Sequence, residues 1–276
     1  MKRKSLIILA PLVVAALAGL AVAQLRGYGR PELPPDRNGV PNWEMNQEFP
    51  TDVFTFVRIE YDSYRGPGRW GGGWATDFPD SDLNLSYRLQ ELTSLKVDPN
   101  GKIIRLTDAE LFDYPFIYFL EPGALRFSED EVVALRRYLL RGGFLMVDDF
   151  WGGQEYDNFY REIKRVFPDR EPQELPIDHD VFRCVYRLKE KPQVPSIHHF
   201  LNGYKFEWRP GPDDGSVAHY RALFDDKGRM MAIICHNTDL GDGWEREGVS
   251  EDFFKECSQK RAYPMGINIL FYAMTH

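Results

Sequence analysis

Residues 142–152 read Gly-Gly-Phe-Leu-Met-Val-Asp-Asp-Phe-Trp-Gly, and this stretch decides the fold class. The glycine pair ends a predicted helix that begins at a capping box on Ser128, and residues 144–147 are a short apolar strand. The strand ends at Asp148-Asp149, and another amphipathic helix follows it. A buried strand between two helices of this length is typical of an α/β domain with a parallel sheet.

The same alternation of strands and helices continues on both sides of this stretch. Residues 53–59 and 116–120 are rich in β-branched and aromatic side chains and predict two further strands. Residues 217–224 and 230–235 predict an antiparallel hairpin, because a turn sequence that ends at Gly228 joins them. We therefore expect a mainly parallel sheet with helices on both faces and an added antiparallel hairpin.

The composition is that of a globular protein: 276 residues, 43% of them hydrophobic and 28% charged. The formal net charge is −8, and an acidic surface repels phosphate backbones, which argues against nucleic-acid binding. Cys184, Cys235 and Cys257 are an odd number of thiols, so at most one disulfide forms within the chain. Their spacing is not that of a structural zinc site.

The first residues have the pattern of an export signal. Met1-Lys2-Arg3-Lys4 is positively charged, residues 6–22 are an unbroken apolar run, and Ala21-Val22-Ala23 is a signal-peptidase site. We expect cleavage after Ala23 and a mature protein in the periplasm or outside the cell. The alternative is an uncleaved anchor, because the run is just long enough to cross a bilayer. The expected organisation is a signal peptide (1–23), a Pro/Gly-rich linker or arm (24–50) and one α/β domain (51–276).

Ligands of open α/β sheets bind at the carboxyl ends of the strands, and polar clusters follow three of the predicted strands. The first cluster contains Glu60, Asp62 and a glycine-rich loop over residues 66–78 that carries Trp70 and Trp74. The loop matches G-x-G-x-x-G, but the glycines and the proline that follow exclude the helix which that motif needs. The loop is a candidate ligand lid, and a flexible surface loop is the alternative.

The second cluster is Asp148-Asp149 with Trp151, beside a predicted helix N-terminus. Two adjacent carboxylates are able to coordinate a cation or to act as acid and base. The alternative is a helix cap next to one solvated charge. Trp151, a large aromatic residue beside the glycine pair Gly152-Gly153, favours the first interpretation, with its ring as the floor of a ligand-binding site.

The third cluster begins where another strand is expected to end. His236 is a candidate base, Asn237 and Asp239 offer oxygen atoms, and Trp244 and Arg246 are candidate ligand contacts. The spacing is not that of an EF-hand, and a hydrogen-bonded polar turn is the alternative. The sequence lacks the G-x-S-x-G, P-loop and H-E-x-x-H signatures.

We expect these clusters to converge on one crevice, with Glu60, Asp148 and His236 at the strand ends. Carboxylates gathered there repel one another, so at least one has a raised pKa unless a cation or Arg246 neutralises them. The residues expected to line the crevice are Asp62, Trp70, Trp74, Asp148, Asp149, Trp151, His236, Asn237, Asp239, Trp244 and Arg246.

Five stretches carry a resemblance to a known family: FTFVRIEY (54–61), DFPDSDLN (77–84), GGFLMVDDFWG (142–152), CHNTDLGDGWE (235–245) and YPMGIN (263–268). They resemble domain-of-unknown-function family 4159, and the resemblance covers residues 51–276. That family is grouped with the class I glutamine amidotransferase-like superfamily, which implies a flavodoxin-like sheet. Catalytic amidotransferases carry a Cys in the elbow between strand and helix, whereas the equivalent elbow here is Asp148-Asp149. The resemblance therefore implies a fold and a site location, without glutamine hydrolysis by a thiolate.

Two functions fit these features. The first is a non-catalytic binding or scaffold domain of the bacterial envelope, with a small polar ligand, a glycan or an envelope protein as its partner. The second is a hydrolase of a glycan or other small polar substrate, with Asp148 or Asp149 and His236 as acid and base, alone or with a divalent cation. Asp148, Asp149 and Asp239 are the candidate ligands of such a cation, and no other cofactor is expected. A membrane partner is expected only if the N-terminal segment stays uncleaved. A wide separation of Asp148 from His236 would exclude the acid–base pair.

Overall fold

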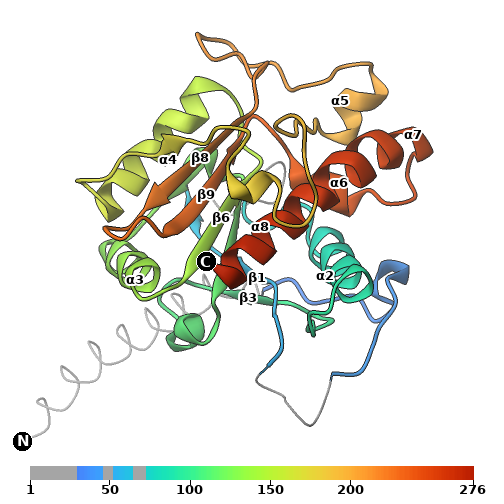
Figure 1. Cartoon of the computed structure of the whole chain (residues 1–276), viewed down its shortest axis with the longest axis horizontal. Coiled ribbons are helices and arrows are strands. Elements are labelled where there is room, and N and C mark those ends of the chain that lie inside the picture. The colour runs from blue at the N-terminus through green and yellow to red at the C-terminus, as the bar shows by residue number, and fades with distance from the viewer. Residues whose placement is uncertain (1–29, 46–51, 65–72) are drawn as a thin grey trace, which may run out of the picture. The chain divides into compact units, whose positions relative to one another are not determined.

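A seven-stranded sheet lies at the centre of the compact unit Leu33–His276 in the computed structural model, which describes residues 30–45, 52–64 and 73–276 (Figure 1). The strand order is β3-β1-β4-β6-β9-β8-β7. The strands are β1 (Val57–Ile59), β3 (Lys102–Ile104), β4 (Phe116–Leu120), β6 (Phe144–Asp148), β7 (Gln173–Glu174), β8 (His219–Phe224) and β9 (Met230–His236).

Five of these described strands, from β3 to β9, are parallel, and β8 is antiparallel to both of its neighbours. Counted along the chain, the parallel strands have the order 2-1-3-4-5, which is the order of flavodoxin-like sheets. The predicted α/β class and the hairpin of β8 and β9 are confirmed. Successive strands are added on one side of β1 (β3) and then on its other side (β4, β6 and β9), and such sheets bind their ligands at this switch point between β1 and β4.

Two details differ from the expected strands. The first strand is regular only over Val57–Ile59, and Phe54 makes a single bridge to Val97 instead. A separate two-stranded antiparallel sheet joins β2 (Asp62–Ser63) to β5 (Leu125–Arg126).

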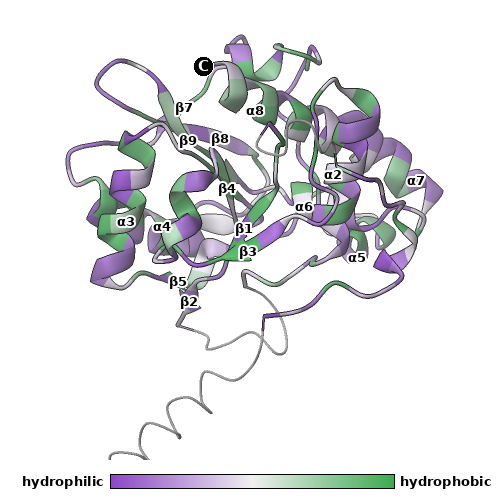
Figure 2. Cartoon of the chain, turned by 90° about the horizontal axis from the view of Figure 1, so that it is seen from below, coloured by the Kyte–Doolittle hydropathy of each residue, from purple (hydrophilic) through white to green (hydrophobic). Residues whose placement is uncertain are grey.

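Helices cover both faces of the large sheet. Helices α3 and α4 lie on one face, and α2, α6 and α8 lie on the other (Figure 1). Their apolar side chains join a separate core cluster on each face. Figure 2 shows hydrophobic residues on the strands between helices whose outer faces are hydrophilic. The helices are α2 (Asp80–Leu92), α3 (Glu129–Leu140), α4 (Gly152–Val166), α5 (Ile197–Leu201), α6 (Leu240–Glu245), α7 (Glu251–Phe253) and α8 (Tyr263–Thr275). Shorter or wider turns are the 3₁₀-helices η1 (Arg37–Gly39), η2 (Ala109–Asp113), η3 (Pro122–Ala124) and η4 (Asp180–Phe182) and the π-helix η5 (Phe254–Ala262).

The helix boundaries follow local sequence signals. The capping box predicted on Ser128 is present at the start of α3, where the Ser128 hydroxyl and the Glu131 carboxylate satisfy each other's backbone amides. At α2 the N-cap residue is Pro79, which makes no side-chain cap hydrogen bond. Asp82 in the first turn accepts a hydrogen bond from Arg58 instead.

The described part of the predicted arm contacts the domain. The Trp43 indole donates to the Val97 carbonyl at 2.8 Å, and Arg37 donates to Pro99 and Asn100. The expected signal peptide lies outside the described residues. Among the residues that are described, no helix is both long and apolar enough to span a bilayer.

Candidate functional site

Acidic side chains from three segments meet at the carboxyl ends of the parallel strands. Asp149 follows β6, Asp239 follows β9, and Asp77 lies in the loop before α2. One carboxylate oxygen of each lies within 4.8 Å of the others, and all three side chains are buried. We call these three residues, together with Asp148, the carboxylate cluster.

Asp148 is the last residue of β6 and is fully buried. Its Oδ2 atom accepts hydrogen bonds from the Tyr118 hydroxyl at 3.1 Å and from the Gly241 amide at 3.0 Å. Its Oδ1 atom has no hydrogen-bond partner among the described residues. Burial raises the pKa of Asp148 to about 8, so this carboxyl holds a proton at neutral pH.

Asp149 is held by the tryptophan that follows it. The Trp151 indole Nε1 donates to Asp149 Oδ1 at 3.0 Å. Burial raises the pKa of Asp149 well above its ordinary value, and the negative charges of Glu121 and Asp77 raise it further.

Asp239 caps helix α6. Its Oδ1 atom accepts from the Asp242 amide at 2.6 Å, and burial together with Asp149 raises its pKa. Asp242 accepts in turn from the Arg246 guanidinium at 3.1 Å, and Arg246 also pairs with Glu245 at 2.7 Å. Arg246 thus supplies positive charge beside the cluster. The expectation that at least one of the clustered carboxylates has a raised pKa is confirmed at Asp148, Asp149 and Asp239.

Asp77 was not predicted from the sequence. Burial, followed by the charge of Asp242, raises its pKa to about 7, and its Oδ2 atom has no hydrogen-bond partner among the described residues. The buried Arg58 of β1 places the Asp77 loop, because its guanidinium donates to the carbonyls of Trp74 at 2.8 Å and Thr76 at 3.0 Å. Arg58 also pairs with Asp82 of α2 at 2.5 Å. An arginine inside an otherwise apolar strand is the sequence signal that points to buried carboxylates nearby.

Three residues immediately after parallel strands adopt left-handed backbone conformations. Glu121 follows β4, Asp149 follows β6 and Asn237 follows β9, with φ values of 47°, 54° and 61°. Such conformations cost energy for residues other than glycine and concentrate at functional sites. They turn the chain sharply at the edge where the carboxylates gather.

His236 and Asp148 leave the sheet on opposite faces. Asp148 bonds to Tyr118 on the face covered by α2, α6 and α8. The His236 ring packs on the other face, with ring centroids 4.8 Å from Phe150 and 5.0 Å from Tyr156 of α4. The expectation that both side chains line one crevice is therefore wrong. Successive strand residues point to opposite faces of the sheet. Asp148, the last residue of β6, shares a face with Met146, whereas His236, the last residue of β9, shares the other face with Ile234.

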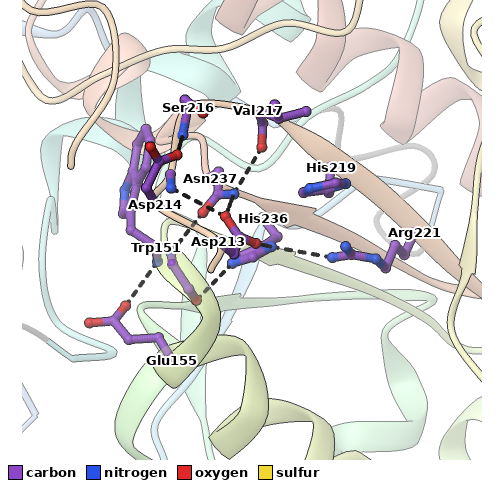
Figure 3. A network of polar contacts seen from close by, with 12 residues as sticks. Trp151, Glu155, Asp213, Asp214, Ser216, Val217, His219, Arg221, His236 and Asn237 are labelled. Atoms are coloured by element: carbon purple, nitrogen blue, oxygen red, sulfur yellow. Dashed lines mark hydrogen bonds and ion pairs between the residues drawn. The ribbon is translucent and has the colours of Figure 1, made fainter. Parts of the chain in front are cut away.

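Both ring nitrogens of His236 are engaged in structural contacts (Figure 3). Nε2 lies 3.1 Å from the Gly152 carbonyl oxygen, and Nδ1 lies 3.2 Å from the Arg221 guanidinium. Burial lowers the pKa of His236 to about 4, against the opposing effect of Asp213. The neutral imidazole therefore donates from Nε2 to the carbonyl and accepts at Nδ1.

Asn237 connects two segments in the same network (Figure 3). Its Oδ1 atom accepts from the Gly152 amide at 2.7 Å. Its Nδ2 atom donates to Asp213 Oδ1 at 2.9 Å and to the Val217 carbonyl at 2.8 Å. These contacts fasten the 209–217 loop to the start of α4, so the described hydrogen bonds of Asn237 are structural.

Glu60 and Asp62 do not join the carboxylate cluster. Arg105 pairs with Glu60 at 2.6 Å and with Asp62 at 3.2 Å, and the Asp62 side chain is 69% exposed. Asp62 belongs to the small sheet rather than to a parallel strand, which explains why it lies apart.

The predicted tryptophan walls have different positions. Trp244 is fully buried in the core against Tyr118, so it is not a lid, and Trp74 is half-buried against the core on the other face of the sheet. Their apolar surface is used in packing. Trp70 lies outside the described residues. Trp151 lines a cavity of about 340 Å³ with Gly123, Gln154, Glu155, Arg209 and Pro210.

This cavity opens where Gly123 and Trp151 follow β4 and β6. Its polar lining includes Arg209, which pairs with Glu207 at 3.0 Å, and Glu155, which accepts from the Trp151 amide at 2.9 Å. The amino-acid sequence matches one family model, over residues 55–274. The chain belongs to the family described as Domain of unknown function (DUF4159). No curated protein sequence matches the chain. Membership of DUF4159 names no reaction, so the function has to be argued from the site.

Proposed function

We propose that this DUF4159 protein is an exported, non-catalytic binding domain of the bacterial envelope that takes a small polar ligand in the cavity beside Trp151. The position of that cavity carries the proposal. It opens at the carboxyl ends of β4 and β6, on the edge where open α/β sheets bind ligands and next to the switch point between β1 and β4. Arg209 and Glu155 offer both a cationic donor and an anionic acceptor to a polar molecule.

The chemistry of the thiols and of His236 favours binding over covalent catalysis. Burial raises the pKa of Cys235 well above its ordinary value, raises that of Cys257 to about 11 and also raises that of Cys184. A thiolate nucleophile needs the opposite shift. His236 is enclosed by α4 and makes contacts that fix the fold.

A hydrolase is the second candidate, and one observation favours it. Asp148 has a pKa of about 8, which suits a general acid. The proposed partner base, His236, lies on the other face of the sheet, so this reading needs a water activated by a bound cation instead.

Export and superfamily membership are parts of the same proposal. The apolar run 6–22 followed by Ala21-Val22-Ala23 supports export. The flavodoxin-like strand order supports a place in the class I glutamine amidotransferase-like superfamily. N-terminal sequencing of the protein from its native host is the test of export: a start at Gln24 supports it, and intact Met1 in the membrane fraction contradicts it.

A thermal-shift screen tests the ligand site. Monosaccharides, amino acids and small carboxylic acids are added separately to the purified protein. A ligand at about 100 times its Kd stabilises the fold by about 2.7 kcal/mol. Arg209→Gln should remove most of the shift, and Arg183→Gln, at an exposed arginine paired with Asp180, should leave it intact. Hits that bind both variants equally, or no hit at all, contradict the proposal.

A further inference from the structure

Asp77, Asp149 and Asp239 bring three carboxylates together in a buried space. Their nearest oxygens lie within 4.8 Å of one another, and each side chain is at least nine-tenths buried. Like charges at this separation repel strongly in a medium of low dielectric constant. The positive charge of Arg58 acts on Asp77 but is outweighed by burial and by Asp242. The three carboxylates therefore need further positive charge among their oxygens, as a cation or as protons.

Two oxygen atoms of the carboxylate cluster have no hydrogen-bond partner among the described residues. This observation is independent of how close the carboxylates lie to one another. Asp77 Oδ2 and Asp148 Oδ1 are buried without a hydrogen-bond partner among the described residues. Buried polar atoms in native proteins are nearly always satisfied, by protein, water or an ion. The two unsatisfied atoms therefore point to a group that satisfies buried oxygens at this site.

Gly241 keeps this space open. A Cβ atom at position 241 would lie 2.6 Å from Asp77 Oδ2 and 3.2 Å from the Tyr118 hydroxyl. The Gly241 amide also donates to Asp148. Only a residue without a side chain allows α6 to begin against these three polar groups.

We propose that Asp77, Asp149 and Asp239 bind a divalent, oxygen-seeking cation, with the unpartnered oxygen of Asp148 beside it. The donor set contains carboxylates only, which suits Mg²⁺, Ca²⁺ or Mn²⁺ better than a metal that prefers His or Cys. The Trp151 indole orients Asp149 and the Asp242 amide orients Asp239, in the manner of the outer groups that fix metal ligands.

A neighbouring carboxylate group is a weaker candidate for the same cation. Asp242 and Glu245 also approach Asp77 within 4.8 Å. Arg246 already pairs with both, and Asp242 further accepts from the Ile197 amide. Arg246 thus offsets part of their negative charge, although Glu245 Oε2 also has no hydrogen-bond partner among the described residues and burial raises the pKa of Glu245 to about 9. Asp77, Asp149 and Asp239, by contrast, have no guanidinium or ammonium in a described ion pair.

This inference goes beyond the proposed ligand cavity and does not depend on it. The test uses the full chain, stripped with a chelator and then titrated with MgCl₂, CaCl₂ or MnCl₂ in calorimetry and thermal unfolding. At about 100 times Kd, the matching ion should raise Tm by roughly 5–10 °C. Asp239→Asn keeps the cap acceptor but removes a charge, and it should weaken binding at least tenfold. Asp62→Asn, the same substitution at an exposed carboxylate of the small sheet, should leave the affinity unchanged.

Terbium luminescence provides a second readout that needs no variant. Tb³⁺ in the cluster lies next to the Trp151 indole, so excitation of tryptophan should give terbium emission that the matching divalent ion displaces. The proposal is overturned if none of the three ions raises Tm and no displaceable emission is seen. It is also overturned if Asp239→Asn and Asp62→Asn bind the ion equally. In either case protons, rather than a metal, neutralise the cluster.

Discussion

The Trp151 indole donates to Asp149 Oδ1 at 3.0 Å while the same residue lines the cavity of about 340 Å³. One side chain therefore touches both the proposed ligand and a proposed cation ligand. Trp151 is also the N-cap residue of α4, so its position is fixed by the helix as well as by Asp149. A change at Trp151 is expected to affect the cavity and the cluster together.

We predict that Trp151→Phe lowers the free energy of unfolding by about 1–3 kcal/mol, because a buried carboxylate loses its donor. Urea unfolding measures this. Trp208→Phe is the matched control, since Trp208 is 63% exposed, and it should change stability by less than about 0.5 kcal/mol. Equal effects of the two substitutions would show that the indole contact contributes nothing.

Arg58 is predicted to be among the most sensitive residues of the fold. All its guanidinium nitrogens donate to groups of the 74–82 segment. Arg58→Met leaves Asp82 buried without its partner and should cost about 3–5 kcal/mol in urea unfolding. Arg105→Met removes a partly exposed arginine and should cost about 1 kcal/mol or less. A small loss at Arg58 would mean that Asp82 finds another partner.

The sequence was sufficient to predict the sheet and its helices, because the signals there are local. Residues 116–120 and 144–147 are unbroken apolar runs, and they form β4 and most of β6. The capping box on Ser128 placed the start of α3 correctly. The length of the first strand was overestimated, because a run of β-branched residues does not show where the neighbouring strands stop pairing with it.

The site was only partly predictable, because its members depend on which face of the sheet each strand end occupies. Asp149 and Asp239 were identified as neighbours, and they do meet. His236 was grouped with them because it lies at the end of a strand. The alternation of side chains along β9 places its ring on the opposite face of the sheet from Asp148. Asp77 lies in a loop with no periodic pattern, and its long-range approach to Asp239 has no local signal.

Gly241→Ala is predicted to destabilise the protein by about 1–3 kcal/mol, although alanine favours helices. The new methyl group would meet Asp77 Oδ2 at 2.6 Å in a buried site. Gly153→Ala in α4 is the control, because its nearest contact would be 3.7 Å from Asp213, and it should be neutral or stabilising. Thermal unfolding of both variants gives the comparison. If Gly241→Ala is as stable as the control, the space beside Asp77 is larger than the structure indicates.

His236 is predicted to make stability fall on mild acidification. Its pKa is about 4 in the folded protein, lowered by burial and by the charges of Arg221 and His219, against about 6.5 in an unfolded chain. Above pH 6.5 the ring is neutral in both the folded and the unfolded state, so its protonation takes nothing from the free energy of unfolding. Between pH 6.5 and 4 the unfolded chain takes up the proton first, and up to about 3 kcal/mol is lost. The raised pKa values of Asp77 and Asp148 act in the opposite direction in every variant. Urea unfolding at pH 7.5 and 4.5 therefore measures the His236 contribution as the difference between the wild type and His236→Gln, which should lose less stability, or gain more, on acidification. His198→Gln, at an exposed histidine, should respond to pH as the wild type does. An equal loss in all three proteins would assign the acid sensitivity to other groups.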